Sequence, residues 1–406
     1  MPSSRIARRL SALAVVLALA CVPLAGCGRK ATDAQAANAS ATSSATSSPG
    51  AAKPAAKASI YDGPAVIAPA STLQPPDYAG FEPLPCFTYH HVSPKVKNGI
   101  AITPATFESQ LKTLADLGFH TITARQLWEH QTKGTPLPSK PVMITFDDGW
   151  RNQFTYAAPL LKKYGMVATF FINPQPIANK YGGYLTSDMV LALSKDGNDI
   201  ESHTWRHIKV IRERTDSADS FQRKNLSQLM LASDWIRKVV GQQPVALCYP
   251  FGYYDLEAIG MAQRAGYKLG FTTDEGIADA RPWDAFQIKR FTITSAETAV
   301  SFKRRLLSGA LQVRNITPAP ASRLVGTTTT VTVDITEVPA GITGLRLSSG
   351  PSLHKTQFVE RNGHKYAEAT FSKARVGFRE ITMLGVDATG RKYYASWGIV
   401  LGDLAH

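Results

Sequence analysis

Short apolar stretches alternate with longer amphipathic stretches between about residues 84 and 312. The apolar stretches are a few residues long and rich in β-branched and aromatic side chains, which is typical of buried strands. The amphipathic stretches repeat apolar residues at intervals of three and four, which is typical of helices packed on a sheet. The predicted strands are 86–89, 121–122, 142–146, 167–172, 199–202, 245–249, 268–272 and 287–293, and the predicted helices are 106–117, 152–164, 187–193, 221–240, 256–265 and 296–307.

This alternation predicts a parallel sheet covered by helices. About eight strands are enough to close a ring, so we predict an α/β fold, a distorted (β/α) barrel of about seven to eight strands over 84–312. A doubly wound open sheet is the alternative. After residue 312 the pattern changes to β-branched and aromatic runs separated by turn sequences such as Asn362-Gly363, which predicts a small all-β, sandwich-like domain over 313–406.

The first 83 residues have a different pattern. Three arginines precede an apolar run over 10–24, which is too short to cross about 30 Å of hydrocarbon comfortably and ends in Leu24-Ala25-Gly26-Cys27. This ending resembles a bacterial lipobox, and the resemblance implies cleavage after a signal peptide over 1–26 and lipidation of Cys27. Residues 27–83 then contain the lipidated cysteine, a tether poor in large apolar residues, which predicts disorder, and a Pro-rich lead-in.

We therefore expect an exported protein, anchored by lipid to a cell membrane and facing outside the cytoplasm. The formal net charge of +14 attracts polyanions in general, but an exported chain without basic clusters interleaved with aromatics is not expected to bind nucleic acid. Once Cys21 and Cys27 are set aside, Cys86 and Cys248 remain, both in apolar strand contexts, and we predict buried free thiols. We expect a monomer.

Two polar motifs follow predicted strands. Asp147 and Asp148 come directly after the strand 142–146, and two adjacent carboxylates at a strand end are costly to bury unless a cation or a reaction uses them. His203 and His207 come after the strand 199–202. Two imidazoles four residues apart face the same way if the chain turns helically, which suits chelation of one metal ion.

Two further motifs are weaker. The sequence Cys248-Tyr249-Pro250-Phe251-Gly252 ends another strand with a sharp turn, which frees backbone N–H groups to point at a ligand. The sequence Tyr89-His90-His91-Val92 ends the first strand of the barrel. Adjacent side chains of a strand point to opposite faces, so only one of the two histidines can face the cleft.

Together these motifs resemble those of the NodB-type polysaccharide deacetylases, carbohydrate esterase family 4. The opening Tyr-His-x-Val is similar to that of their poly-β-1,6-N-acetylglucosamine deacetylase branch. The resemblance implies that Asp148, His203 and His207 are metal ligands and that Asp147 is the general base. It also implies that the backbone N–H of Tyr249 donates to the oxyanion.

The chain departs from the family pattern at two places. Many members carry an arginine that orients the base at the position of Cys248, and Arg290 is the candidate substitute. The late Leu-x-x-His motif that usually supplies the acid is absent, and the resemblance to the branch points to His90, which we expect to titrate near neutrality. Trp205 and Tyr253 are candidates for stacking on sugar rings.

Amide hydrolysis needs an activated water, a stabilised oxyanion and an acid for the departing amine. A Zn²⁺ ion with three protein ligands keeps a position open for water and lowers its pKa, so zinc is the expected cofactor. The predicted activity is metal-dependent deacetylation of an N-acetylated polysaccharide, with poly-β-1,6-N-acetylglucosamine as the favoured substrate. Peptidoglycan or chitin-type oligomers are alternative substrates.

Two other classes of protein are compatible with parts of this pattern. Non-haem Fe(II) oxygenases share the ligand set of two histidines and one carboxylate, but they usually use β-sandwich scaffolds rather than alternating strands and helices. A catalytically weak, polysaccharide-binding surface lipoprotein is the second alternative, because the usual acid is missing.

Overall fold

The computed structural model describes residues 80–402, except for 97, 214, 283–284, 351 and 373–376. The described residues belong to one compact unit, Ile60–His406. The predicted signal peptide, the lipidation site at Cys27 and the tether up to residue 79 lie outside the described residues. Among the described residues, no helix is both long enough and apolar enough to cross a membrane.

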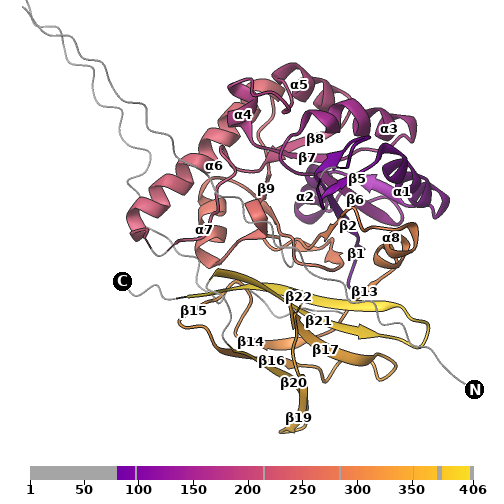
Figure 1. Cartoon of the computed structure of the whole chain (residues 1–406), viewed down its shortest axis with the longest axis vertical. Coiled ribbons are helices and arrows are strands. Elements are labelled where there is room, and N and C mark those ends of the chain that lie inside the picture. The colour runs from indigo at the N-terminus through magenta and orange to yellow at the C-terminus, as the bar shows by residue number, and fades with distance from the viewer. Residues whose placement is uncertain are drawn as a thin grey trace, which may run out of the picture. The chain divides into compact units, whose positions relative to one another are not determined.

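A curled parallel sheet forms the centre of the first part of the chain, with helices on its outside (Figure 1). The strand order is β10-β9-β8-β7-β6-β2-β12, and β5 pairs with the first half of β6. A single parallel bridge between Phe271 and Ile288 links β10 to the segment that leads into β12. The predicted distorted barrel is confirmed. Its strands are β2 Cys86–Tyr89, β5 His120–Ile122, β6 Pro141–Phe146, β7 Thr169–Ile172, β8 Asp199–Ser202, β9 Ala246–Cys248, β10 Leu269–Phe271 and β12 Phe291–Thr292.

The predicted helices are present, and two further helices, α2 and α4, were not predicted. In α2 the Thr123 side chain and Gln126 form a reciprocal capping box, and the helix ends at Gly134 in the left-handed conformation. The helices are α1 Pro104–Asp116, α2 Ala124–Lys133, α3 Ala158–Lys163, α4 Pro174–Ala178, α5 Ser187–Lys195, α6 Ala218–Val240, α7 Leu256–Arg264 and α8 Ala299–Leu306, with a π-helical turn η2 Gln153–Ala157 and a 3₁₀ turn η3 Pro250–Gly252.

The predicted helix over 152–164 begins with the π-helical turn η2. Pro159 lies in the first turn of α3 and has no N–H to donate to the carbonyl four residues earlier. The N–H of Ala158 instead donates to the carbonyl of Gln153, five residues back. The wider turn places Gln153 so that its side chain donates to the carbonyl of Asp147, which anchors the loop after β6.

Two short strand pairs lie beside the barrel sheet. Strand β1 Pro83–Leu84 pairs with β11 Ala278–Asp279, and β3 His91–Val92 pairs with β4 Ala101–Ile102. Cys86 and Cys248 are free and buried on β2 and β9, as predicted.

Two further sheets follow the barrel. One has the order β13-β22-β21-β17-β18 with β15 beside β22, and the other has the order β14-β16-β20-β19. Side chains from both, such as Val331 and Trp397, share one buried apolar cluster, so the predicted sandwich-like region is confirmed. The strands are β13 Gly309–Ala310, β14 Arg314–Thr317, β15 Arg323–Leu324, β16 Thr329–Asp334, β17 Thr343–Ser349, β18 Ser352–Leu353, β19 Gln357–Arg361, β20 His364–Phe371, β21 Gly377–Val386 and β22 Lys392–Leu401.

The barrel and the β-sheet region share a packed boundary. Leu384 and Tyr394 of the second region belong to the same buried cluster as barrel residues. The N–H of Gly398 on β22 donates to the hydroxyl of Tyr254, 2.9 Å away. Because β13 already pairs with β22, the second region begins at Gly309, slightly ahead of the predicted division at residue 312.

Candidate active site

Asp147 and Asp148 follow directly after β6, at the carboxyl-terminal end of the barrel sheet. The N–H of Asp147 still donates to the carbonyl of Tyr89 on β2, 2.9 Å away, so Asp147 continues the strand. Asp148 then adopts a left-handed conformation with a φ of 75°. This turn sends the neighbouring carboxylates to different surroundings: Asp147 is buried in the barrel, and Asp148 is partly exposed.

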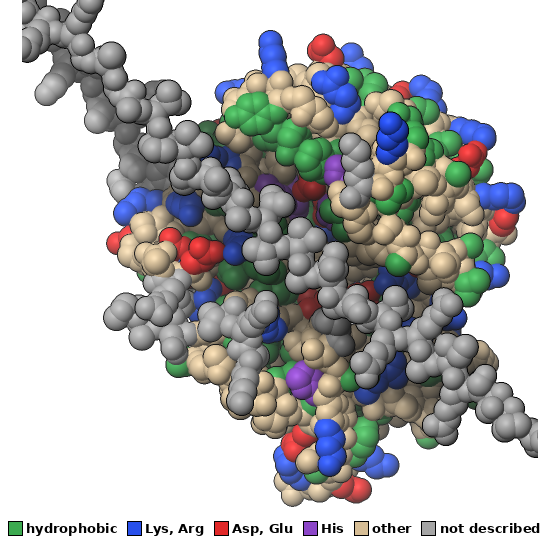
Figure 2. All heavy atoms as spheres, in the orientation of Figure 1, with side chains coloured by type: hydrophobic (Ala, Val, Ile, Leu, Met, Phe, Trp, Pro, Cys, Tyr) green, Lys and Arg blue, Asp and Glu red, His purple; other side chains and the backbone are tan. Residues whose placement is uncertain are grey.

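The carboxylate of Asp148 lies next to the imidazoles of His203 and His207. Its Oδ1 is 3.5 Å from Nε2 of His203 and 3.4 Å from Nε2 of His207. The two histidines meet as predicted, but not through the helical turn that the sequence argument assumed. The segment is not helical, and Thr204 and His207 have φ values of 65° and 55°. Two left-handed residues, rather than a helix, aim both rings at Asp148. Figure 2 shows histidine and acidic side chains together in a hollow of the visible face.

These three residues fit a divalent cation. Nδ1 of His203 lies 2.8 Å from the carbonyl oxygen of Cys248, and because a carbonyl only accepts, Nδ1 carries a proton and Nε2 is the nitrogen left to face Asp148. Burial alone would lower the pKa of this imidazole, but without a metal Cys248 and the carboxylates of Asp148 and Asp147 raise that pKa, so either a proton or a cation is favoured at Nε2. Oδ1 of Asp148 is buried and has no hydrogen-bond partner among the described residues. A bare carboxylate oxygen facing imidazole lone pairs is unfavourable unless a proton or a cation lies between them. One carboxylate and two imidazoles are also a common ligand set for transition metals.

The carboxylate of Asp147 forms a bidentate ion pair with Arg290. Both N–H···O distances are 2.8 Å, and Arg290 is fully buried, where it also donates to two threonine hydroxyls. Burial alone would raise the pKa of the Asp147 carboxyl, but the Arg290 guanidinium holds that pKa below its usual value. Arg290, directly before β12, therefore makes the contact with Asp147 that was predicted for it as the substitute of an arginine at position 248.

Asp147, His203 and Cys248 form a second group of possible ligand atoms. Sγ of Cys248 accepts a hydrogen bond from Arg290 at 3.0 Å, and the pKa of this thiol is raised, chiefly by burial, so it stays protonated. A cation bound here would lie against the buried guanidinium and be repelled by it. The group around Asp148 is therefore the better candidate for a metal.

His90 and His91 have different surroundings, as the alternation of a strand predicts. The His91 ring lies 4.6 Å from the Trp150 ring, and its Nδ1 is 3.0 Å from Nδ2 of Asn152. Nδ1 of His90 is buried without a partner among the described residues. Burial lowers the pKa of His90, although the carboxylate of Asp147 opposes the shift. A pKa near neutrality was expected, but burial outweighs the carboxylates, so this imidazole is uncharged at neutral pH.

The role predicted for Tyr249 is wrong. Its N–H donates to the carbonyl of Phe271 on β10 at 3.0 Å, so it belongs to the sheet and is not available to an oxyanion. Pro250 has no N–H, and that of Phe251 makes no hydrogen bond within the described part of the chain. Phe251 has a φ of 61°, and its ring lies 4.5 Å from that of His207. Phe251 is the residue of this loop that can offer an N–H beside the histidines.

The two predicted sugar-stacking residues differ in their contacts. The ring of Tyr253 stacks on Phe378 of β21 at 5.1 Å, and Nζ of Lys209 lies 5.7 Å from its centre. Tyr253 therefore packs against the following sheets but is only partly buried, so its role in stacking on sugar rings stays a prediction. The backbone of Trp205 is held by Gln175 and Gln228, and the side chain is partly exposed, so its role stays a prediction.

Trp150 was not predicted as a site residue, although it directly follows the Asp-Asp-Gly motif. Its Nε1 donates to Oδ2 of Asp148 at 2.9 Å, and its ring stacks on Tyr184 at 4.4 Å. The indole thereby occupies one oxygen of the carboxylate and leaves the other facing the histidines. The exposed ring of Phe251 and the indole of Trp150 are thus two aromatic groups in direct contact with candidate ligands, His207 and Asp148.

The fold and the site define a class of protein. A parallel α/β barrel that gathers carboxylates and imidazoles at the carboxyl ends of its strands has the arrangement of a barrel enzyme, since such barrels carry their chemistry at this end. Residues 134–270 match the family model described as polysaccharide deacetylase. The chain is also 31% identical over 224 residues to the "Putative polysaccharide deacetylase YxkH" of Bacillus subtilis (strain 168), covering 54% of this chain and 74% of that protein. The chain belongs to the polysaccharide deacetylase family.

Other relatives agree with this family. The poly-beta-1,6-N-acetyl-D-glucosamine N-deacetylase of Escherichia coli (strain K12) is 21% identical over 271 residues, which are 58% of this chain but only 40% of that protein. Among solved structures, the Streptococcus pyogenes deacetylase PplD has the same barrel fold, with a TM-score of 0.51 and 23% identity over 56% of this chain and 99% of its own.

Proposed function

We propose that the protein is a metal-dependent N-deacetylase that acts on a polymer of N-acetylglucosamine, with poly-β-1,6-N-acetylglucosamine as the favoured substrate. One observation carries the metal dependence: the buried Oδ1 of Asp148 has no donor and faces the Nε2 atoms of His203 and His207. The relatives named as poly-β-1,6-N-acetylglucosamine deacetylases support the substrate at low identity. Peptidoglycan and chitin oligomers are the competing substrates.

Asp148, His203 and His207 would hold the ion, and their donor set favours Zn²⁺. A divalent cation bound there would lower the pKa of a water molecule and polarise the acetyl carbonyl. The protein groups supply the rest. Asp147, ionised and oriented by Arg290, accepts a proton from the attacking water, and the N–H of Phe251 donates to the oxygen that becomes negative.

The departing amine needs a proton, and His90 is the proposed donor. Because burial keeps its imidazole uncharged in the resting protein, His90 would take the proton that Asp147 accepted from the water and pass it to the nitrogen as the C–N bond breaks, which returns Asp147 to its ionised form. The unpartnered Nδ1 of His90 beside Asp147 is available to take that role.

We also propose that the catalytic domain is carried outside the cytoplasm on a lipid anchor at Cys27 and acts as a monomer. This part of the proposal rests on the amino-acid sequence, since the anchor and tether lie outside the described residues. Metabolic labelling with a fatty acid, comparing the natural chain with Cys27→Ala, would test it, and equal labelling of both would contradict it.

Acetate release from defined β-1,6 and β-1,4 N-acetylglucosamine oligomers tests the activity. We expect release from the β-1,6 oligomers, loss of release on chelation, and recovery when Zn²⁺ is added back. A chain that binds the oligomers without releasing acetate, with any added metal, would be a binding lipoprotein rather than an enzyme.

Two matched substitutions separate the neighbouring carboxylates. Asp148→Asn should lower the metal content and the rate together, because a ligand is lost. Asp147→Asn should retain the metal but lower the rate by roughly 10² to 10⁴-fold, because an amide cannot accept the proton. Loss of metal from the Asp147 variant alone would reverse the two roles.

A further inference from the structure

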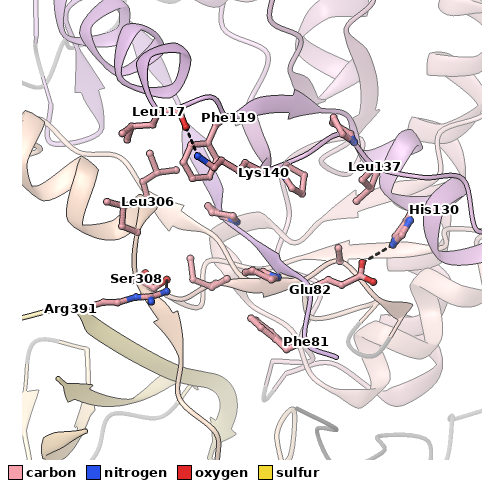
Figure 3. Close-up of a pocket in the computed structure, with 17 residues that line it drawn as sticks. Phe81, Glu82, Leu117, Phe119, His130, Leu137, Lys140, Leu306, Ser308 and Arg391 are labelled. Carbon is pink, nitrogen blue, oxygen red and sulfur yellow. Dashed lines mark hydrogen bonds and ion pairs between the residues drawn. The ribbon is translucent and has the colours of Figure 1, made fainter. Parts of the chain in front are cut away.

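A cavity of about 930 Å³ lies at the amino-terminal end of the barrel strands (Figure 3). It is lined by Phe81–Pro83 and Pro85 before β2, by Pro141 at the start of β6, and by Leu306–Ser308 at the end of α8. The candidate catalytic groups follow the opposite ends of the same parallel strands, so this cavity is separate from them. Its volume is within the range of about 300 to 1,000 Å³ that is usual for small-molecule sites.

The wall of the cavity is largely apolar. Phe81, Leu117, Phe119 and Leu137 line it and are only half-buried, and Leu307 is 41% exposed. Leaving this much contiguous apolar surface in water is unfavourable, by about 25 cal/mol for each Å². An apolar ligand that covers it would recover that free energy.

The acidic group of the cavity has a side-chain partner, whereas its two basic groups are bonded, among the described residues, only to backbone carbonyls. The carboxylate of Glu82 is paired with His130, whose Nε2 lies 2.9 Å from it. Lys140 donates to the carbonyl of Leu117 at 2.9 Å, and Arg391 donates to the carbonyl of Ser308 at 3.2 Å. Within the described part of the chain neither cation has a carboxylate partner. Figure 3 shows Arg391 beside Ser308, well away from the Glu82–His130 pair.

More positive charge surrounds the Arg391 end. Burial lowers the pKa of the neighbouring Lys392, and the nearby Arg304 and Arg346 lower it further. Arg304, Arg305 and Arg346 act on Lys392, which is next to Arg391, and Glu275 is the carboxylate that opposes them, so an anion at this end would lie near an excess of positive charge.

We propose that this cavity binds a single-chain anionic lipid, with its acyl chain against the apolar wall and its phosphate head at Arg391. An unbranched chain matches a wall with few hydrogen-bonding groups, and the head supplies the counter-ion that Arg391 lacks. Burial of each CH₂ contributes about 0.8 kcal/mol, and a single acyl chain binds membranes with a constant of about 10⁴ M⁻¹. The site is independent of the deacetylase activity proposed above.

Titration of the full chain with lysophosphatidylglycerol below its micelle concentration tests the proposal, with lysophosphatidylcholine of the same chain length as the neutral-headed comparison. We expect one saturable site, with a dissociation constant on the order of 10⁻⁴ M or tighter and about tenfold tighter binding of the anionic lipid. Arg391→Gln should remove this preference, and Leu137→Asp should weaken binding of both lipids at least about tenfold, because it places a charge in the apolar wall.

Two substitutions of exposed residues outside the cavity, Arg361→Gln and Leu353→Asp, are the matched controls and should bind like the natural chain. Acetate release should be unaffected in all four variants, and circular dichroism checks their folding. Absence of saturable binding, or equal binding by the Leu137 variant, would overturn the proposal. Lipid binding that appears only after residues 60–79 are deleted would also overturn it, since these residues, and not a lipid, would then be the occupant of the cavity.

Discussion

Trp150 decides which oxygen of Asp148 faces the two histidines. Its indole N–H holds Oδ2 at 2.9 Å, and the stack on Tyr184 fixes the indole in turn. In metal sites, residues that hold a ligand in this way typically change metal affinity by about 10 to 100-fold when they are removed. Trp150 therefore has the contacts of a positioning residue rather than of a sugar platform alone.

We predict that Trp150→Phe lowers the affinity for Zn²⁺ by about 10 to 100-fold, because the ring is kept and only the N–H to Asp148 is lost. Equilibrium titration against a competing chelator measures this without any assay of activity. Trp128→Phe on α2 is the control, since the indole of Trp128 contacts the side chains of Arg125 and Lys133 rather than the site. Equal zinc affinity in the Trp150 variant and the natural protein would remove this role.

His90 and His91 give a second prediction. His90→Ala should slow hydrolysis of an N-acetyl substrate far more than hydrolysis of an activated acetate ester, because the leaving group of the ester needs no proton. His91→Ala should slow both substrates alike, since His91 contacts Trp150 and Asn152 instead. An amide-specific defect in the His91 variant would mean that the two histidines are assigned the wrong way round.

The loop after β9 depends on two consecutive left-handed residues, Phe251 and Gly252, with φ values of 61° and 71°. A Cβ at Gly252 would collide with the side-chain oxygen of Thr273. The same turn directs the N–H of Phe251 and places its ring against His207. The sharp turn predicted for this motif is thus the element that shapes one wall of the site.

We predict that Gly252→Ala lowers the melting temperature at least about twice as much as Gly241→Ala, since strain at such positions costs about 1 to 3 kcal/mol and the collision adds to it. Gly241 at the end of α6 has a φ of 78° but no atom near its would-be Cβ, so its substitution measures the backbone strain alone. Calorimetry of both variants provides the comparison. Equal melting temperatures would show that the loop moves away from Thr273 at little cost.

For the whole molecule, Glu380 connects the barrel to the β-sheet region. The N–H of Glu275 donates to its Oε1 at 2.7 Å, and the hydroxyl of Thr382 donates to the same atom. Burial and the nearby carboxylate of Asp274 raise the pKa of Glu380 to about 8. The contact between the two regions is therefore expected to favour the protonated carboxyl.

The free energy of unfolding should fall as the pH rises towards the raised pKa of Glu380. An unfolded glutamate titrates near pH 4.3, so between about pH 5 and 8 the folded state holds a proton that the unfolded state releases. We predict that the melting temperature of the natural protein falls by at least about 3 °C more than that of Glu380→Gln between pH 6 and pH 8.5. Glu360→Gln, on an exposed residue of β19, is the control. Parallel curves for Glu380→Gln and the natural protein would contradict the prediction.

The hydrophobic pattern was sufficient to predict the order of strands and helices, because the spacing of apolar residues that marks each element is a local property of the sequence. It predicted β2 and β8 to the residue, and it placed Asp147, Asp148 and His203 at strand ends, which in a parallel barrel meet at one edge. It missed α2, in which only Ala124 and Leu127 are buried, so its apolar pattern is weak, and α4, which has 5 residues. The two free, buried cysteines also followed from local context.

Only the tertiary structure decided which atoms meet. Arg290 lies 143 residues from Asp147, and nothing local in the sequence determines that their side chains form a bidentate pair. The N–H of Tyr249 is used by β10, and this depends on strand pairing rather than on the motif around it. The ring of Tyr253 packs on Phe378 for the same reason, since β21 is distant in sequence. Residue types and their spacing thus determine the available chemistry, whereas contacts between distant segments determine which donor, acceptor and charge each group faces.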